Sequence, residues 1–252
     1  SFQEVLAKSS ITSQSSDPLY SNADFMPLVD FPEFNWSMSP SLKHQIGGPE
    51  GFYLGQLLWK TDMSLKLRRN LTIHSSFGIN IYDTFDDFNN PSASTIPHVR
   101  SDIQDYLSEG KNNLARLQAQ YFASPFKDWF FRADLGLFEE MFGGYGAEYL
   151  YYPEGSLFGF GAEYFSLAKR GYEMDFDFLD YRNDIFRINA FIKDPSTKII
   201  FKLSAGEYLA GDRGYTFEAK RRFDNGVEFS AFYSNTDVPK ELFGEGSFDK
   251  GI

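Results

Sequence analysis

The chain has 252 residues, of which 42% are hydrophobic and 18% aromatic, with no cysteine and a formal net charge of -11. The lack of cysteine excludes thiol catalysis and thiolate metal sites, and the acidic balance argues against nucleic acid as a partner. No run approaches the ~20 apolar residues of a membrane helix. This excludes a helical membrane protein but not a strand-built one, because every second residue of a barrel strand faces a polar interior.

Residues 1–33 show no apolar period, and the stretch rich in serine and threonine at 9–16 predicts a linker or periplasmic segment. From Asn35 onward, apolar and polar side chains alternate, which is typical of strands with one apolar face. The alternation predicts strands at 36–43, 57–68, 71–81, 115–121, 131–137, 145–151, 158–164, 186–192, 199–206, 215–220 and 227–233. Residues 34–252 are therefore predicted to be all-β, with about 11–12 visible strands.

Connections of two lengths are predicted to alternate along this region. Short turns are expected at 68–70, 124–128, 153–156, 194–197 and 224–226, and longer connections at 83–112, 138–144, 168–183, 208–214 and 235–250. Outer-membrane barrels have this rhythm, with tight periplasmic turns and long extracellular loops. We therefore predict an antiparallel transmembrane β-barrel of the outer-membrane type. A soluble antiparallel barrel or sandwich remains the alternative.

The polar face of the predicted strands carries cationic and amide side chains that an acidic or hydroxyl-rich substrate could contact. The candidates for such a path are Lys60, Lys66, Arg68, Arg116, Gln118, Arg132, Arg187 and Lys202. The alternative is that the mixed charges of this face only solvate or brace the lumen. A β-bulge would also move a side chain to the other face.

The longest connection contains a segment of helical character. Val99, Ile103, Tyr106 and Leu107 fall near one face of a helix over 98–107. This segment is either a loop folded inward as a lid or constriction, or a small helix packed on the barrel rim.

Three patterns suggest catalysis or metal binding, and each has a simpler explanation. Glu139 and Glu140 resemble a glycosidase pair, but neighbours in an extended chain point to opposite sides. His74 near Ser75 or Ser76 loosely resembles a membrane lipase, without any oxyanion feature. The three histidines lie far apart in the sequence, and the Asp-Arg-Gly and Asp-Asn-Gly tripeptides fit turns better than calcium loops. We expect no enzyme activity, no metal and no cofactor.

Several connections resemble those of the YjbH/GfcD family of exopolysaccharide and capsule export proteins. The motifs are IPHVRSD at 96–102, LFEEMFGGYGAE at 137–148, LAGD at 209–212, RRFDNG at 221–226 and FGEGSFDKG at 243–251. Two of them contain the loop-motif candidates Arg100, Asp102, Glu139 and Glu140. The resemblance runs from about Trp36 to the C-terminus, and residues 1–33 carry none of it.

The resemblance implies an outer-membrane barrel that helps to move an extracellular polysaccharide and has no established catalytic residues. The implied partners are outer-membrane lipids, a polysaccharide and other exopolysaccharide secretion proteins. Proteins of this family are larger than this chain, so we expect the barrel wall to continue past Ile252. The alternatives are a general porin or small-solute channel and, from another class, a membrane-embedded enzyme that modifies lipid or glycan.

Overall fold

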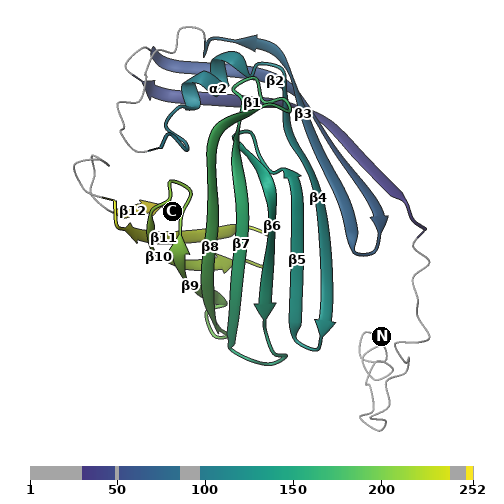
Figure 1. Cartoon of the computed structure of the whole chain (residues 1–252), viewed down its shortest axis with the longest axis vertical. Coiled ribbons are helices and arrows are strands. Elements are labelled where there is room, and N and C mark those ends of the chain that lie inside the picture. Colours follow the sequence, from purple (N-terminus) through teal and green to yellow (C-terminus); the bar gives the residue numbers. More distant parts are fainter. Residues whose placement is uncertain (1–29, 49–50, 86–96, 239–247, 252) are drawn as a thin grey trace, which may run out of the picture. The chain divides into compact units, whose positions relative to one another are not determined.

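The computed structural model describes residues 30–48, 51–85, 97–238 and 248–251 (Figure 1). The chain divides into two compact units, Ser1–Phe31 and Pro32–Ile252, and all the strands belong to the second. Most of the predicted segment 1–33 lies outside the described residues. Within the described part of the chain, no helix combines the length and apolar character needed to cross a membrane.

One antiparallel sheet of twelve strands forms the second unit, and every strand pairs with its neighbours in chain order. The strands are β1 (Glu33–Gly48), β2 (Gly51–Arg68), β3 (Leu71–Asp83), β4 (Asn113–Phe126), β5 (Trp129–Leu137), β6 (Phe142–Tyr151), β7 (Phe158–Arg170), β8 (Phe178–Asp194), β9 (Ile199–Glu207), β10 (Arg213–Arg222), β11 (Glu228–Thr236) and β12 (Phe248–Gly251). This arrangement confirms the predicted all-β antiparallel fold. No pairing joins β1 to β12 among the described residues, so the sheet is open here and its closure into a barrel is not shown.

The apolar side chains of the strands share one face, which we call the outer face. In the register, Leu135 of β5 pairs with Ala119 and Tyr145, and Ile188 of β8 pairs with Ala162 and Ala205. Large apolar side chains on this face are exposed. One from each of the first eleven strands is Trp36, Trp59, Ile79, Tyr121, Leu135, Tyr149, Phe160, Ile188, Leu203, Phe217 and Phe229.

The opposite, inner face is polar and is the more buried of the two. Gln118, Asp134, Glu163, Asn189 and Ser204 are each 9% exposed or less, whereas Leu135 on the outer face is 62% exposed. Soluble sheets bury their apolar face and expose their polar one. This sheet does the reverse, which argues against the soluble sandwich considered above.

Helix α2 (Ile103–Glu109) lies in the long connection between β3 and β4 (Figure 1). Its Tyr106 is buried in one cluster with Met141, Phe142 and Met174, and its Leu107 in another with Leu54 and Phe85. Phe142 pairs with Lys169 and alternates in step with inner-face residues of β6. Of the two interpretations of the segment 98–107, the structure therefore favours a loop that folds onto the inner face.

The predicted alternation of connection lengths is only partly correct. The connections after β2, β4 and β8 are tight and the one after β3 is long, as expected. The connection predicted to be long at 138–144 is only 138–141, whereas the one predicted to be short at 153–156 spans 152–157. The segment 168–183 is largely strand, because β7 extends to Arg170 and β8 begins at Phe178. Strand β12 falls at the end of the predicted loop 235–250.

A glycine at the loop end of β5 allows two strands to approach closely. Gly136 has φ +128, which side-chain-bearing residues rarely adopt, and an added Cβ would collide with the carbonyl oxygen of Leu117. Its neighbour in β6 is Gly144, also at positive φ. The backbone therefore requires glycine at both positions.

Candidate functional site

A hydrogen-bonded ion network occupies the middle of the inner face. Arg132 binds Asp134 through Nε at 2.9 Å and Glu148 through Nη2 at 2.6 Å. Gln120 donates from Nε2 to Asp134 at 2.9 Å, and Gln118 donates to the same carboxylate. The side chain of Asp134 is 1% exposed. The buried carboxylate is therefore compensated by one cation and two amides, which is what such burial requires.

The network continues on the next strands. Arg187 binds Glu163 through Nε at 2.5 Å, and Ser204 donates from Oγ to the side-chain oxygen Oδ1 of Asn189 at 2.6 Å. Strand register connects the two parts, because Glu148 pairs with Glu163 and Glu163 with Arg187. Polar contacts thus run across the inner face from β4 to β9.

The predicted path residues lie on the inner face with one exception. Those that the register places there are Lys60, Lys66, Arg116, Gln118, Arg132, Arg187 and Lys202. A register shift between Lys66 and Arg68 pairs Arg68 with Leu71 at the exposed turn. Alternation therefore does not assign Arg68 to either face, and its place on the inner face stays a prediction. The role of these residues in a substrate path stays a prediction.

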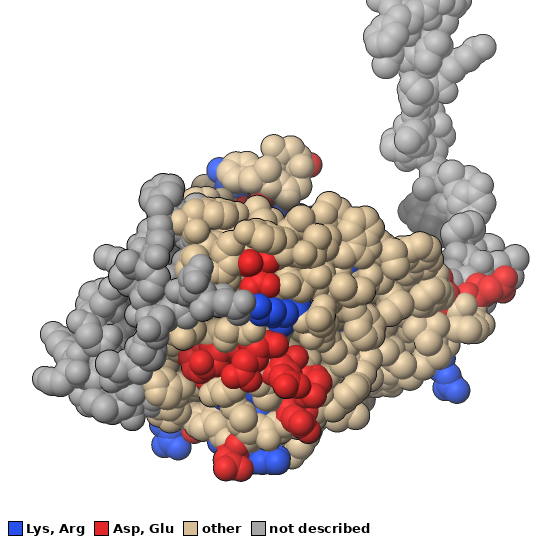
Figure 2. All heavy atoms as spheres, turned by 90° about the horizontal axis from the view of Figure 1, so that it is seen from above, with Lys and Arg blue, Asp and Glu red and all other residues tan. Residues whose placement is uncertain are grey.

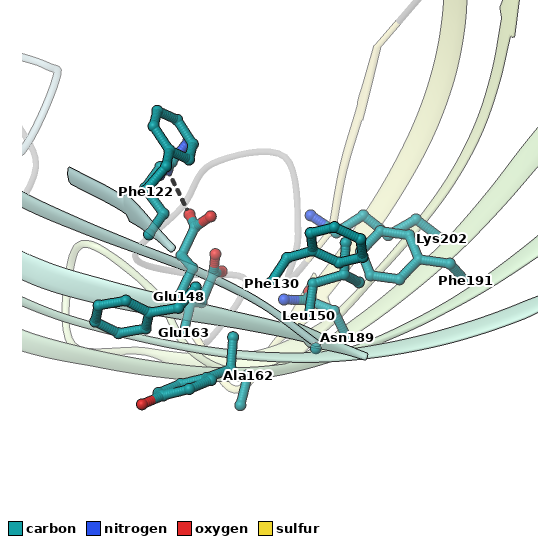
Figure 3. A pocket seen from close by; sticks show the side chains of 13 residues that line it. Phe122, Phe130, Glu148, Leu150, Ala162, Glu163, Asn189, Phe191 and Lys202 are labelled. Carbon is teal, nitrogen blue, oxygen red and sulfur yellow. Dashed lines mark hydrogen bonds and ion pairs between the residues drawn. The ribbon is translucent and has the colours of Figure 1, made fainter. Parts of the chain in front are cut away.

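A cavity of about 260 Å³ opens on the inner face of β4–β9 (Figure 3). Its walls combine aromatic and polar side chains. The inner-face members are Phe122, Phe130, Arg132, Glu148, Leu150, Gly161, Glu163, Asn189, Phe191 and Lys202. Figure 3 labels Phe130 and Phe191 among the side chains that line this cavity, and the ammonium of Lys202 lies 5.8 Å from the ring centroid of Phe191. The sequence analysis missed the aromatic members, although they interrupt the polar face of their strands and so carry a readable signal.

A second cavity, of about 270 Å³, contains the histidine and serines considered for catalysis. His74, Ser75 and Ser76 line it together with Asp62 and Arg116. The hydroxyl oxygens of both serines are buried and have no hydrogen-bond partner in the described structure. Neither serine hydroxyl is therefore hydrogen-bonded to the His74 imidazole in this structure.

A buried ion pair fixes the start of α2 to the sheet. Asp102, the residue before the helix, binds Lys169 of β7, and the two side chains are 8% and 4% exposed. Lys169 also donates to the carbonyl of His98 and lies 5.8 Å from the ring centroid of Tyr106. Burial raises the pKa of the Tyr106 phenol well above its usual range, and Asp102 acts in the same direction. The neutral phenol donates to the carbonyl of Arg170 at 2.6 Å.

Arg170 at the end of β7 is fully buried and donates hydrogen bonds to the backbone of several connections. Its guanidinium donates to the carbonyls of Glu139 at 2.6 Å, Leu114 at 2.8 Å, and Met174 and Asp175 at 2.7 Å. Sequence analysis placed Arg170 in a loop and did not single it out. Its role depends on carbonyls far apart in sequence, which alternation cannot show.

The remaining loop-motif residues lie at this same end of the sheet. Glu139 pairs with Arg100 at 2.6 Å, and the neighbouring Glu140 pairs with Lys43 of β1. The two carboxylates therefore have different cationic partners, and the structure gives them no shared substrate position. All four motif residues serve to connect 97–102, 138–141 and the strands in the described structure.

Acidic side chains gather around a few cationic ones on the face viewed from above in Figure 2. The connection 171–177 contributes Glu173, Asp175 and Asp177 to the acidic composition of this end. No group of three or more histidine, aspartate or glutamate side chains within the described ranges has the arrangement of a metal site.

The fold and site define an all-β protein in which one antiparallel meander carries an apolar outer face and a braced polar inner face. Residues 2–252 match the YjbH family, described as "Exopolysaccharide biosynthesis protein YbjH". The chain belongs to this family. The match begins at residue 2, so the prediction that 1–33 carry no resemblance was wrong.

One relative is the "Uncharacterized lipoprotein YjbH" of Escherichia coli (strain K12). It is 35% identical over 237 residues, which cover 89% of this chain and 33% of the relative. The chain thus spans about a third of the length of the curated relative it matches. The family resemblance predicted from the loop motifs is confirmed.

Proposed function

We propose that this chain forms part of the wall of an outer-membrane β-barrel that helps to export an exopolysaccharide or capsule and is not itself an enzyme. The observation that carries the proposal is the exposed apolar outer face, which runs across the first eleven strands. Burial of apolar area stabilises by about 25 cal/mol per Å², so an uncovered face of this size favours contact with lipid over water.

The inner face supports the polar half of the proposal. Its charges are braced by opposite charges and amides, as at Arg132 and Asp134, so they withstand removal from bulk water while still lining a wet lumen. Barrel closure is part of the proposal, either by direct pairing of the free edges of β1 and β12 or through further strands. A closed sheet has no unpaired edge, which a membrane requires.

The family description supports polysaccharide as the cargo, and the lipoprotein name of the relative supports a membrane location. Outer-membrane lipids and other exopolysaccharide secretion proteins are the proposed partners. Helix α2, which packs on the inner face at the loop end, would narrow the passage on the extracellular side.

The test is export from a strain that lacks the protein and is complemented with wild type or variants. We expect secreted polysaccharide to fall without the protein and to be restored by wild type, with the protein in the outer-membrane fraction. Restoration by the triple variant Glu139→Gln, Glu140→Gln and His74→Ala is expected if no catalysis occurs. Unchanged secretion in the deletion strain would refute the export role.

Single-channel conductance separates export from the porin alternative. In planar bilayers, the purified protein is expected to conduct weakly, and polysaccharide is expected to block that current. Large, steady conductance that polysaccharide does not alter would instead identify a general channel.

A further inference from the structure

Four apolar side chains interrupt the polar inner face at the cavity of β4–β9. Phe122, Phe130, Leu150 and Phe191 occupy positions that the alternation reserves for polar residues, in register with Arg132, Gly161 and Asn189. Phe122 is 49% exposed and Phe130 is 47% exposed. Lipid contact explains aromatic residues on the outer face but not these. Exposed rings in a polar cavity are typical of ligand sites.

Polar groups stand on both sides of these rings. Figure 3 shows the carboxylates of Glu148 and Glu163 on one side, with Asn189 and Lys202 beside Phe130 and Phe191 on the other. Gly161 has no side chain and pairs with both Leu150 and Asn189, and Cε2 of Phe191 lies 3.6 Å from where a Cβ of Gly161 would stand, so the Phe191 ring lies over this glycine. The cavity therefore offers one aromatic surface with hydrogen-bonding groups at its edges.

Lys202 differs from the other cations of the cavity. Arg132 and Arg187 are both bound to carboxylates, whereas Lys202 has no ion pair within the described part of the chain. Its ammonium lies 5.8 Å from the ring centroid of Phe191. Lys202 is thus the cation of this cavity available to an anionic ligand.

We propose that this cavity binds one pyranose ring that carries a carboxylate. The C–H face of the sugar packs on Phe130 and Phe191, its carboxylate binds Lys202, and its hydroxyls bond to Asn189 and Glu148. The volume of about 260 Å³ lies just below the ~300–1,000 Å³ of drug-sized ligand sites, which suits one ring rather than an oligosaccharide. The assignment rests on the proposed function, since it names the class of sugar handled by that inner face.

The test is calorimetric titration of the whole purified protein in detergent. The probes are hyaluronan tetrasaccharide, which contains glucuronate, and cellotetraose, which is neutral. We expect the acidic probe to bind more tightly. Phe130→Leu is expected to weaken its binding about tenfold, the size of one well-placed contact. Lys202→Gln is expected to abolish the preference for the acidic probe, and Lys202→Arg to keep it.

The matched controls change the same chemistry elsewhere. Phe158→Leu lies on the outer face, and Lys127→Gln lies in the turn between β4 and β5. Both are expected to bind like wild type. Equal binding of the two probes, no binding of the acidic one, or no change in Phe130→Leu would overturn the assignment. Because Phe130 is 47% exposed, Phe130→Leu is expected to leave the fold of the sheet unchanged.

Export separates this inference from the proposed function. Loss of acidic-sugar binding in Phe130→Leu is measured on isolated protein and does not depend on secretion. A wild-type protein that supports export but binds neither probe refutes the subsite alone. If the purified protein binds the acidic probe but the deletion strain secretes as much polysaccharide as wild type, the export role alone is refuted.

Discussion

The ion pair between Lys169 and Asp102 is the most buried charge interaction at the loop end. Both side chains are less than one-tenth exposed, and together they connect the start of α2 to β7. Removal of one partner from a buried pair leaves an uncompensated charge, which costs more than the intact pair contributes. The position of α2 should therefore depend strongly on this one contact.

Lys169→Met is expected to lower the free energy of local unfolding of α2 by about 3–5 kcal/mol, because Asp102 would stay buried without its cation. Hydrogen exchange of the amides of Ile103–Glu109 measures this change. The double variant Lys169→Met with Asp102→Leu should recover much of the protection, since it removes both charges. Equal protection in wild type and the single variant would contradict the assignment.

Arg100→Gln provides the matched control at the same end. Its pair with Glu139 is solvent-exposed, with side chains 54% and 37% exposed. Exposed pairs contribute only about 0–1 kcal/mol, so the protection of α2 should scarcely change. A loss as large as that of Lys169→Met would show that burial does not determine the strength of these contacts.

Gly110→Ala tests the close approach that ends α2. An added Cβ would lie 2.6 Å from the carbonyl oxygen of Tyr106 and 2.9 Å from that of Tyr172. Backbone must shift to accept it, at a cost of about 1–3 kcal/mol. Hydrogen exchange in α2 is expected to rise, while the control Ser108→Ala within the helix leaves it unchanged. No difference between the two variants would contradict the packing described.

At the scale of the strand, the two faces of β4 and β5 respond differently to an added charge if lipid covers one of them. Leu135→Arg on the outer face is expected to lower the free energy of unfolding in the membrane by about 2–4 kcal/mol if this position lies near the bilayer centre. Gln120→Arg on the inner face adds the same group beside Asp134. We expect only the first to lose membrane incorporation and heat-modifiable gel migration. In a soluble protein the exposed Leu135 would accept arginine freely, so equal incorporation would refute the lipid contact.

Strand positions were predictable because alternation with period two depends only on neighbouring residues. The ends of β7 and β8 were not, since Arg170 is held by the carbonyl of Glu139, which is distant in sequence, and Phe178 at the start of β8 pairs with Arg170 across a register shift. The bulge at Arg68 and the four-residue β12 also escape a pattern that needs regular repeats. Local order was therefore visible in the sequence, whereas the limits of each strand depend on tertiary contacts.

The candidate site was predictable in part for a related reason. Charged residues such as Arg132 and Arg187 were placed on the inner face by parity, and the structure shows which carboxylates they bind. The aromatic cavity residues were passed over because an apolar residue is expected in a strand. Only the register shows that Phe130 and Phe191 reach the same cavity from β5 and β8.

At the scale of the whole second unit, the inverted arrangement of faces is the main result. An apolar outer surface with a buried, braced polar inner surface is unfavourable in water and favourable in a bilayer. The chain that forms this sheet belongs to a family described as exopolysaccharide biosynthesis proteins. Contact between the outer face and lipid is the central claim that joins these two findings.

Tryptophan fluorescence tests this claim most directly. The chain has three tryptophans, and Trp36, Trp59 and Trp129 all lie on the outer face, 61%, 42% and 41% exposed. The protein is reconstituted in vesicles of brominated or ordinary phosphatidylcholine. We expect bromine to quench all three tryptophans in single-tryptophan variants and aqueous iodide to quench them weakly. Strong quenching by iodide without quenching by brominated lipid would contradict lipid contact.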